Sequence, residues 1–173
     1  MKKADAIPMV IRSIPEFCRL MELPPPEHPL VSVIRPETIR QLPADLPPTV
    51  VLNFFSVWLK PNCNMRFFLP GRVPASELEG CSKHRGWWLL IHPDFLLHCS
   101  VSKNIQQYGL FAQAEDGVLY LAEKEEQLMA GILQDIEQGY LSPREKCSQA
   151  AILGQVETLL CFAERFYRRQ VNN

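Results

Sequence analysis

Proline divides the chain into two parts of different character. Of the 15 prolines in the 173 residues, 13 lie before residue 75, and only Pro93 and Pro143 follow. Proline removes a backbone donor and breaks the interior of a helix or a central strand. The first part is therefore expected to form short strands, turns and extended connections, and long helices are expected only in the second part.

Three apolar runs are predicted to be strands. Residues 50–60 are rich in β-branched and aromatic side chains, as strands are, and residues 65–69 form a second run before a turn at Pro70-Gly71. Residues 86–92 form an almost wholly apolar run that ends at Pro93. Such a run is typical of a buried strand that stops because proline cannot continue the ladder.

The segment after Pro93 is predicted to be irregular. We expect one helical turn over residues 93–97 and a short helix over residues 101–108, where apolar side chains recur at helical spacing. Within residues 111–121, Asp116-Gly117 is typical of a turn. This part is predicted to be either a hairpin or a strand that enters the next helix.

Two amphipathic helices are predicted in the second part. In residues 123–140, apolar side chains recur every three or four positions, and Gly139 is expected to help end the helix. A second helix is predicted over residues 143–168, because Ser142, Pro143 and Glu145 match a capping box with proline at the first helical position. At 1.5 Å per residue it would be roughly 38 Å long.

The second helix carries two neighbouring apolar rows. One row is Ile152, Val156, Leu159, Ala163 and Phe166, and the other is Leu153, Leu160 and Tyr167. So wide an apolar face favours one row packing on the parent domain and the other on a second chain. The alternative is that both rows are buried within one protomer. The candidate dimer interface is Leu153, Val156, Leu160, Ala163 and Tyr167.

Composition and charge narrow the possible functions. The chain is 47% hydrophobic and 21% charged, as ordinary globular proteins are, and its net charge of −1 creates no field that attracts phosphate backbones. The N-terminus lacks the apolar run of a signal peptide, and no stretch approaches the roughly 18 apolar residues of a membrane helix. We therefore expect a cytoplasmic protein with no membrane contact.

Catalytic and metal chemistry are not expected. The four histidines, His28, His84, His92 and His98, contain no HxH pair, although a metal site needs converging ligands. The six cysteines form no CxxC pair and are interpreted as free, mostly buried thiols. No nucleotide-binding or nucleophile motif is present. We predict no enzyme activity, no cofactor, no metal and no catalytic residue.

Aromatic residues are the better indication of a binding site. They concentrate in the predicted strands, where alternation sends neighbours such as Trp87 and Trp88 to opposite faces. One of each pair would fill the core while the other lines an apolar ligand cavity. The alternative is that they are core residues, and that His92 only ties down the turn after its strand. The candidate ligand-binding residues are Phe55, Trp58, Phe68, Trp87, Trp88 and His92.

Four motifs resemble the N-terminal sensor domain of AraC-type transcription regulators from Bacteroides-like bacteria. They are GWWLLIHPDFL at 86–96, KNIQQYGLF at 103–111, LYLAEKEE at 119–126 and ERFYRRQ at 164–170. The resemblance implies an α+β fold with a cupin-like antiparallel β-barrel followed by two C-terminal helices. Relatives have a longer stretch where this chain has only residues 61–64, which predicts a shortened barrel.

The resemblance also implies an organisation and a function. Residues 1–121 would be the β-rich sensor region with its Pro-rich N-terminal segment, and residues 122–173 a two-helix dimerisation region packed on it in a single structural domain. The chain would bind a small-molecule effector, form a homodimer, and reach DNA only through a helix-turn-helix domain that it lacks. The alternative is a free-standing protein-interaction domain that dimerises without a small-molecule ligand.

Overall fold

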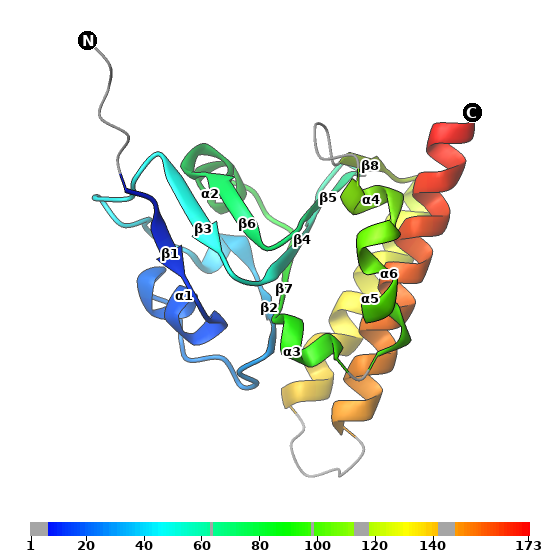
Figure 1. The fold of residues 1–173 in the computed structure, drawn as a ribbon, viewed down its shortest axis with the longest axis horizontal. Coiled ribbons are helices and arrows are strands. Elements are labelled where there is room, and N and C mark those ends of the chain that lie inside the picture. The colour runs from blue at the N-terminus through cyan, green and yellow to red at the C-terminus, as the bar shows by residue number, and fades with distance from the viewer. Residues whose placement is uncertain (1–6, 63, 98, 113–117, 142–147) are drawn as a thin grey trace.

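The computed structural model describes residues 7–62, 64–97, 99–112, 118–141 and 148–173. These residues form eight strands in two sheets, and two long helices follow at the C-terminus (Figure 1). The predicted α+β class with two C-terminal helices is confirmed. The Asp116-Gly117 turn and the Ser142, Pro143 and Glu145 cap lie outside the described residues.

A five-stranded antiparallel sheet forms the middle layer of the molecule. In spatial order its strands are β2 (Val31–Ile34), β7 (Trp87–Ile91), β4 (Phe55–Lys60), β5 (Asn64–Phe68) and β8 (Val118–Tyr120). Both faces of this central sheet are covered. Strands β4 and β7 are therefore apolar at nearly every position, as their sequences indicate.

A smaller sheet lies against one face of the central sheet. It consists of β1 (Met9–Ile11), β3 (Thr49–Leu52) and β6 (Gly71–Pro74), with β1 parallel and β6 antiparallel to β3. Strand pairing does not join the two sheets among the described residues, so the expected barrel is not closed there. The sheets instead face each other across a shared core.

The predicted strand at residues 50–60 is wrong, because it is two strands in different sheets. Strand β3 ends at Leu52 in the small sheet, and β4 begins at Phe55 in the central sheet. Between them, the Asn53 backbone N–H donates to the Ile11 carbonyl over 3.0 Å, and the Phe54 side chain is fully buried. The apolar run continues through the crossing because β3 packs into the core between the two sheets and β4 is buried on both of its faces.

The proline-rich part contains one short α-helix, contrary to expectation. It is α1 (Ile14–Leu20), and α2 (Ala75–Ser82) follows directly after this part. Helix α1 tolerates Pro15 because the proline lies in the first turn, where its missing N–H would have no intrahelical partner. The Ser13 hydroxyl caps that turn by accepting from the Glu16 N–H over 3.2 Å.

The chain that follows β7 is a series of short turns. Pro93–Leu96 forms α3 as predicted, but the predicted helix over residues 101–108 is wrong. Two 3₁₀ turns, η2 (Ser100–Lys103) and η3 (Ile105–Gln107), replace it because Asn104 between them has φ −124° and ψ 0°. After α4 (Gly109–Ala112), β8 leads directly into the next helix, which was one of the two predicted alternatives.

Helices α5 (Glu123–Leu141) and α6 (Ser148–Asn172) cover the other face of the central sheet (Figure 1). Both predicted helices are confirmed, and α6 continues past the predicted end at Arg168. Gly139 does not end α5. A Cβ at this position would lie 2.9 Å from Ile152 Cγ1, so the glycine allows α6 to approach closely.

Two apolar cores therefore share the central sheet. The larger core lies between the sheet and the α5–α6 pair and includes Val57, Leu89, Ile136 and Leu159. The second lies between the sheet, the small sheet and α1, and includes Phe17, Trp58 and Trp88. Alternate residues of β4 and β7 point into different cores, as the period of two in a strand requires.

Candidate functional site

The predicted ligand residues with the largest side chains are packed in the two cores. Trp58 and Trp88 are each 1% exposed between the two sheets, and the ring of Phe55 packs edge-on against Phe111 in the other core. Trp87 and Trp88 point to opposite sides of the sheet, as predicted. These four side chains do not converge on one site.

The space beside Trp88 is water-sized. The Trp88 indole N–H donates to the Ser56 hydroxyl, and a void of about 10 Å³ lies there, lined by Ser56, Phe68, Glu77, Cys81 and other side chains. A cavity needs roughly 10–15 Å³ to hold one water. The void beside Phe68 and Trp88 is therefore large enough for one water molecule at most.

Trp87 and His92 have structural partners at the ends of β7. The Arg35 guanidinium lies 3.1 Å from the centroid of the Trp87 ring, and its Nε is 3.4 Å from the Glu137 carboxylate on α5. His92 Nδ1 accepts from the Asp94 backbone N–H over 3.2 Å and caps α3. The alternative interpretation of His92, as the residue that ties down this turn, is confirmed.

The structure buries most of the predicted dimer interface within one chain. Val156, Leu160 and Ala163 are 0% exposed, Tyr167 is 7% exposed, and Leu153 is partly buried against the same core. The interpretation of Leu153, Leu160 and Tyr167 as a row that faces a partner is corrected accordingly. A charge at Leu160 would disrupt the core of the monomer and would not simply separate two copies.

The cover over this row comes from residues 99–112, which we call the connecting segment. The apolar spacing of residues 101–108 predicts a short helix, but it does not indicate that the segment lies against α6. It approaches α6 so closely that a Cβ at Gly109 would lie 2.6 Å from Tyr167 Cε1. Both apolar rows of α6 are consequently buried, one against α5 and the sheet and the other beneath this segment.

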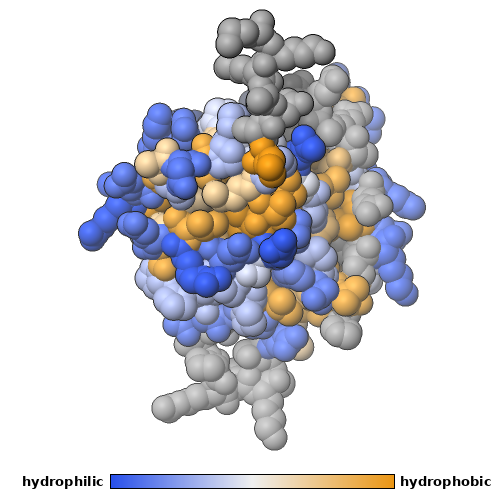
Figure 2. Space-filling view, turned by 60° about the vertical axis from the view of Figure 1, so that its left-hand side comes forward, coloured by the Kyte–Doolittle hydropathy of each residue, from blue (hydrophilic) through white to orange (hydrophobic). Residues whose placement is uncertain are grey.

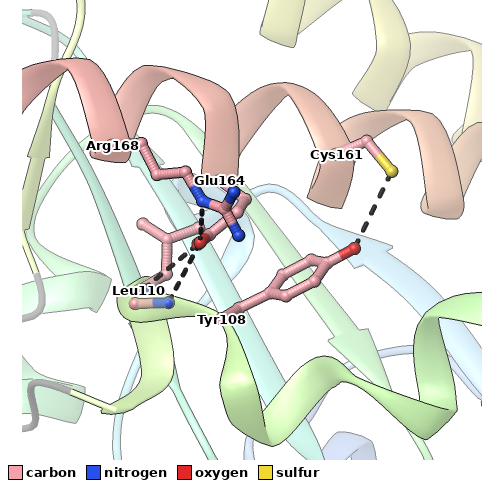
Figure 3. A network of polar contacts seen from close by, with 6 residues as sticks. Tyr108, Leu110, Cys161, Glu164 and Arg168 are labelled. Atoms are coloured by element: carbon pink, nitrogen blue, oxygen red, sulfur yellow. Dashed lines mark hydrogen bonds and ion pairs between the residues drawn. The ribbon is translucent and has the colours of Figure 1, made fainter.

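Three side chains of α6, Glu157, Cys161 and Glu164, contact the connecting segment. Figure 3 shows the contacts of Cys161 and Glu164. The buried Glu164 carboxylate accepts from the backbone N–H groups of Gly109, over 3.2 Å, and Leu110, over 3.4 Å. Cys161 Sγ lies 3.9 Å from the Tyr108 hydroxyl, and Glu157 accepts from the Ser100 hydroxyl. Burial, and then the contact with Cys161, raise the pKa of Tyr108 to about 12.

Side chains in the last turns of α6 bind β8 and the first turn of α5. The Gln170 side chain accepts from the Tyr120 N–H over 2.9 Å and donates to the Val118 carbonyl over 3.1 Å. Arg169 pairs with Glu125, and this hydrogen bond lowers the pKa of that carboxyl. Three of the four quoted motifs, at 103–111, 119–126 and 164–170, thus meet on the C-terminal half of α6.

The outward face of α6 is left uncovered. Seven of the exposed positions on α6 follow alternating steps of three and four residues: Ala151, Gly154, Thr158, Cys161, Arg165, Arg168 and Asn172. A groove runs along this face, lined by Gly154, Glu157, Thr158, Cys161, Phe162 and Arg165. We refer to these nine residues together as the outward face. It is the candidate functional site. Its small and charged residues resemble any exposed side of a helix in the sequence, so apolar periodicity does not indicate it.

A second exposed apolar area lies on the small sheet. Figure 2 shows hydrophobic side chains gathered on this side of the molecule between hydrophilic ones. Ile7 is 89% exposed, and Val10 on β1 is 38% exposed beside Val51 on β3. Arg72 lies next to Val51 in the register of β6.

The cysteines of the described residues differ in environment. Cys18, Cys81 and Cys99 are buried and Cys161 is exposed, and the prediction of free thiols is confirmed for Cys18, Cys81 and Cys161. Burial raises the pKa of Cys18 to about 11 and that of Cys81 to about 12. In the part of the chain described, no group of three or more His, Cys, Asp or Glu side chains could hold a metal ion.

Two further findings bear on the class of protein. Within the described ranges, no helix combines the length and the apolar character needed to cross a membrane. Comparisons of the chain with family models, with curated proteins and with solved structures found no match. The resemblance to AraC-type sensor domains rests on the four motifs alone.

Proposed function

We propose that this chain is the ligand-sensing and dimerisation domain of an AraC-type transcription regulator, and that it associates through α6. The observation that carries the proposal is the outward face of α6. This 25-residue helix is roughly 37 Å long, and both of its apolar rows are buried within the same chain. The outward face, with its groove, is exposed. Grooves between side-chain ridges on a helix are where the side chains of a second helix pack.

The contacts of the connecting segment support a role in signal input. Phe111 packs edge-on against Phe55 and Phe67 of the central sheet, with ring centroids 5.9 and 5.8 Å away. Two residues earlier, the backbone of the same segment is bonded to Glu164 on α6. A change in the core of the sheet would thereby reach α6, and a helix-turn-helix domain joined to the chain would convert it into altered DNA binding.

A reporter assay tests the association. The chain is fused to a DNA-binding domain that represses a reporter only as a dimer, and we expect the fusion to restore repression. Thr158→Lys, which places a charge in the groove, should reduce repression, whereas Gln134→Lys at an exposed position of α5 should not. A fusion that fails to repress, together with a monomer by light scattering at high micromolar concentration, would refute the proposal.

A second candidate is a dimerisation domain without a small-molecule ligand. The specific observation in its favour is that Trp58 and Trp88 fill the space between the two sheets. A thermal-shift screen against small metabolites separates the two candidates, because a ligand that binds only the folded state raises its stability with concentration. Saturable stabilisation supports sensing, and its absence in a protein that dimerises supports the second candidate.

A further inference from the structure

We propose that a phosphate group binds in the pocket between Tyr108 of the connecting segment and the C-terminal half of α6, where Arg165 and Arg168 hold it. The inference rests on the proposed function, because it names the chemical class of the ligand that the domain would sense. It also places that ligand outside the two apolar cores, in which most of the predicted ligand residues are packed.

The pocket lies where the connecting segment borders the outward face of α6. It has a volume of about 310 Å³ and is lined by Tyr108, Cys161, Glu164, Arg165 and Arg168. Figure 3 shows four of these five side chains gathered between α6 and the segment. Ligand sites in proteins usually have volumes of roughly 300–1,000 Å³, so this pocket suits a phosphate group with a small substituent.

The side chains that line the pocket offer mainly hydrogen-bond donors to a ligand. Arg165 is exposed, and among the described residues no hydrogen bond or ion pair engages it. Arg168 is bonded to Glu164 through its Nε, so its two terminal amino groups can donate to a ligand. The pKa of Tyr108 is raised to about 12, first by burial, so its hydroxyl stays protonated and can donate as well.

Glu164 does not cancel the positive charge of the pocket. Its buried carboxylate already accepts from the backbone N–H groups of Gly109 and Leu110 and from Arg168. The positive charge of Arg165 is then left for a ligand. The helix dipole does not account for this arginine, because the dipole acts within the last turn and Arg165 lies seven residues before the end of α6 at Asn172.

The directions of the donors favour phosphate over a planar carboxylate. Two guanidinium groups stand on α6 and one hydroxyl on the connecting segment, and a phosphate offers terminal oxygens in three directions. The Tyr108 hydroxyl can turn to a phosphate oxygen at small cost, because its present contact, 3.9 Å from Cys161 Sγ, involves a weakly bonding sulfur. A bound phosphate would therefore bridge the segment and the helix.

The Cys161 thiol reports on occupancy, because it lines the pocket and is exposed. In a background with Cys63→Ser and Cys147→Ser, the rate of its alkylation by uncharged iodoacetamide is followed by peptide mass. We expect inorganic phosphate to slow the reaction saturably, by roughly tenfold at concentrations well above a dissociation constant of about 1 mM, which suits so small a ligand. Sodium chloride at the same ionic strength only screens charge and should not slow it.

A phosphorus NMR titration measures binding without relying on Cys161. Arg165→Gln and Arg168→Gln should each weaken phosphate binding by roughly tenfold, and Tyr108→Phe, which removes only the hydroxyl, by several-fold. Arg72→Gln is the matched control, because Arg72 is equally exposed but lies on β6. Arg165 makes no contact that folding needs, so an Arg165→Gln protein that binds phosphate as tightly as the wild type would overturn the inference.

A phosphate ester and free phosphate are compared in the same titration. Tighter binding of glycerol 3-phosphate than of inorganic phosphate would support an esterified ligand, and the reverse would support phosphate itself. Equal protection of Cys161 by chloride and phosphate at matched ionic strength would show screening alone and would overturn the site.

The reporter fusion separates this inference from the proposed function. If the fusion represses as a dimer but the chain binds no phosphate, the pocket is not a ligand site and the proposed function stands. If the chain binds phosphate through Arg165 and Arg168 but remains monomeric at high micromolar concentration and its fusion does not repress, the phosphate site stands and the proposed function is refuted.

Discussion

At the scale of single residues, Glu164 is the clearest case of a charge placed for structure. Its carboxylate is buried, with the residue only 6% exposed, and it satisfies two backbone donors of the connecting segment. Glu164→Ala would leave both N–H groups without an acceptor, and we expect a loss of about 2–3 kcal/mol in the free energy of unfolding, measured with urea.

Arg168→Ala is the matched control for this measurement. Arg168 pairs with the same carboxylate at 2.9 Å, but its side chain is 68% exposed. Exposed ion pairs are worth at most about 1 kcal/mol, so this variant should be nearly as stable as the wild type. Equal losses in the two variants would show that the ion pair matters and the backbone bonds do not.

His28 should make stability depend on pH. Its Nδ1 accepts from the Leu30 N–H over 3.1 Å, and burial lowers the pKa of the ring. The folded state therefore favours the neutral ring. We expect stability to decline as the pH falls below the ordinary histidine value of about 6.5 and to level off below the folded pKa.

A comparison of the wild type with a His28→Asn variant isolates the contribution of His28 to the pH dependence of stability. His28→Asn keeps an acceptor for the Leu30 N–H, since asparagine side chains form such turns, but it does not titrate. Urea unfolding of both proteins from pH 8 to pH 5 should show a loss in the wild type that is smaller in the variant. Parallel curves would mean that His28 does not titrate differently in the folded state.

At the scale of elements, close approach decides where glycine is needed. A Cβ at Gly109 would lie within 3 Å of two atoms of the Tyr167 ring, whereas a Cβ at Gly131 on α5 would meet nothing within 4 Å. We expect Gly109→Ala to destabilise the protein by about 1–3 kcal/mol through overpacking. Gly131→Ala should stabilise it by roughly 0.5–1 kcal/mol through helix propensity, in the same unfolding assay.

The elements that could be predicted from the sequence are those whose own residues indicate their structure. Pro93 ends β7 and starts α3, and the apolar periodicity within residues 123–140 and 143–168 predicts α5 and α6. The crossing at Asn53 could not be found, because both strands beside it are buried. The role of Leu160 was misjudged because the connecting segment forms short turns, and their spacing in the sequence does not indicate that they lie against α6.

The candidate site illustrates the same limit. The outward face of α6 consists mainly of small and charged residues, which in a sequence resemble any exposed side of a helix. Only the burial of both apolar rows, by α5 and the sheet on one side and by the connecting segment on the other, shows which positions remain open. Apolar periodicity predicts the helix α6, but the elements that pack against it in the tertiary structure determine which of its sides is exposed.

At the scale of the whole molecule, the central sheet should make unfolding cooperative. With Trp87 replaced by phenylalanine, Trp58 and Trp88 report on the core beside the small sheet, whereas the helical signal comes mainly from α5 and α6 on the other side. Because both cores are built on the same strands, we expect tryptophan fluorescence and far-ultraviolet circular dichroism to give coincident urea transitions. Separate midpoints would show that the two layers unfold independently.

The alternation of β4 also has an evolutionary consequence. Its odd-numbered residues Phe55, Val57 and Leu59 pack toward the helices, whereas Ser56 and Trp58 face the small sheet. Substitutions in β4 that improve packing against altered helices therefore fall on residues that do not contact the small sheet. Substitutions that improve packing against an altered small sheet likewise fall on residues that do not contact the helices. Descendants of this chain could remodel one layer while inheriting the other unchanged, with a single strand serving as the boundary between two independently varying halves.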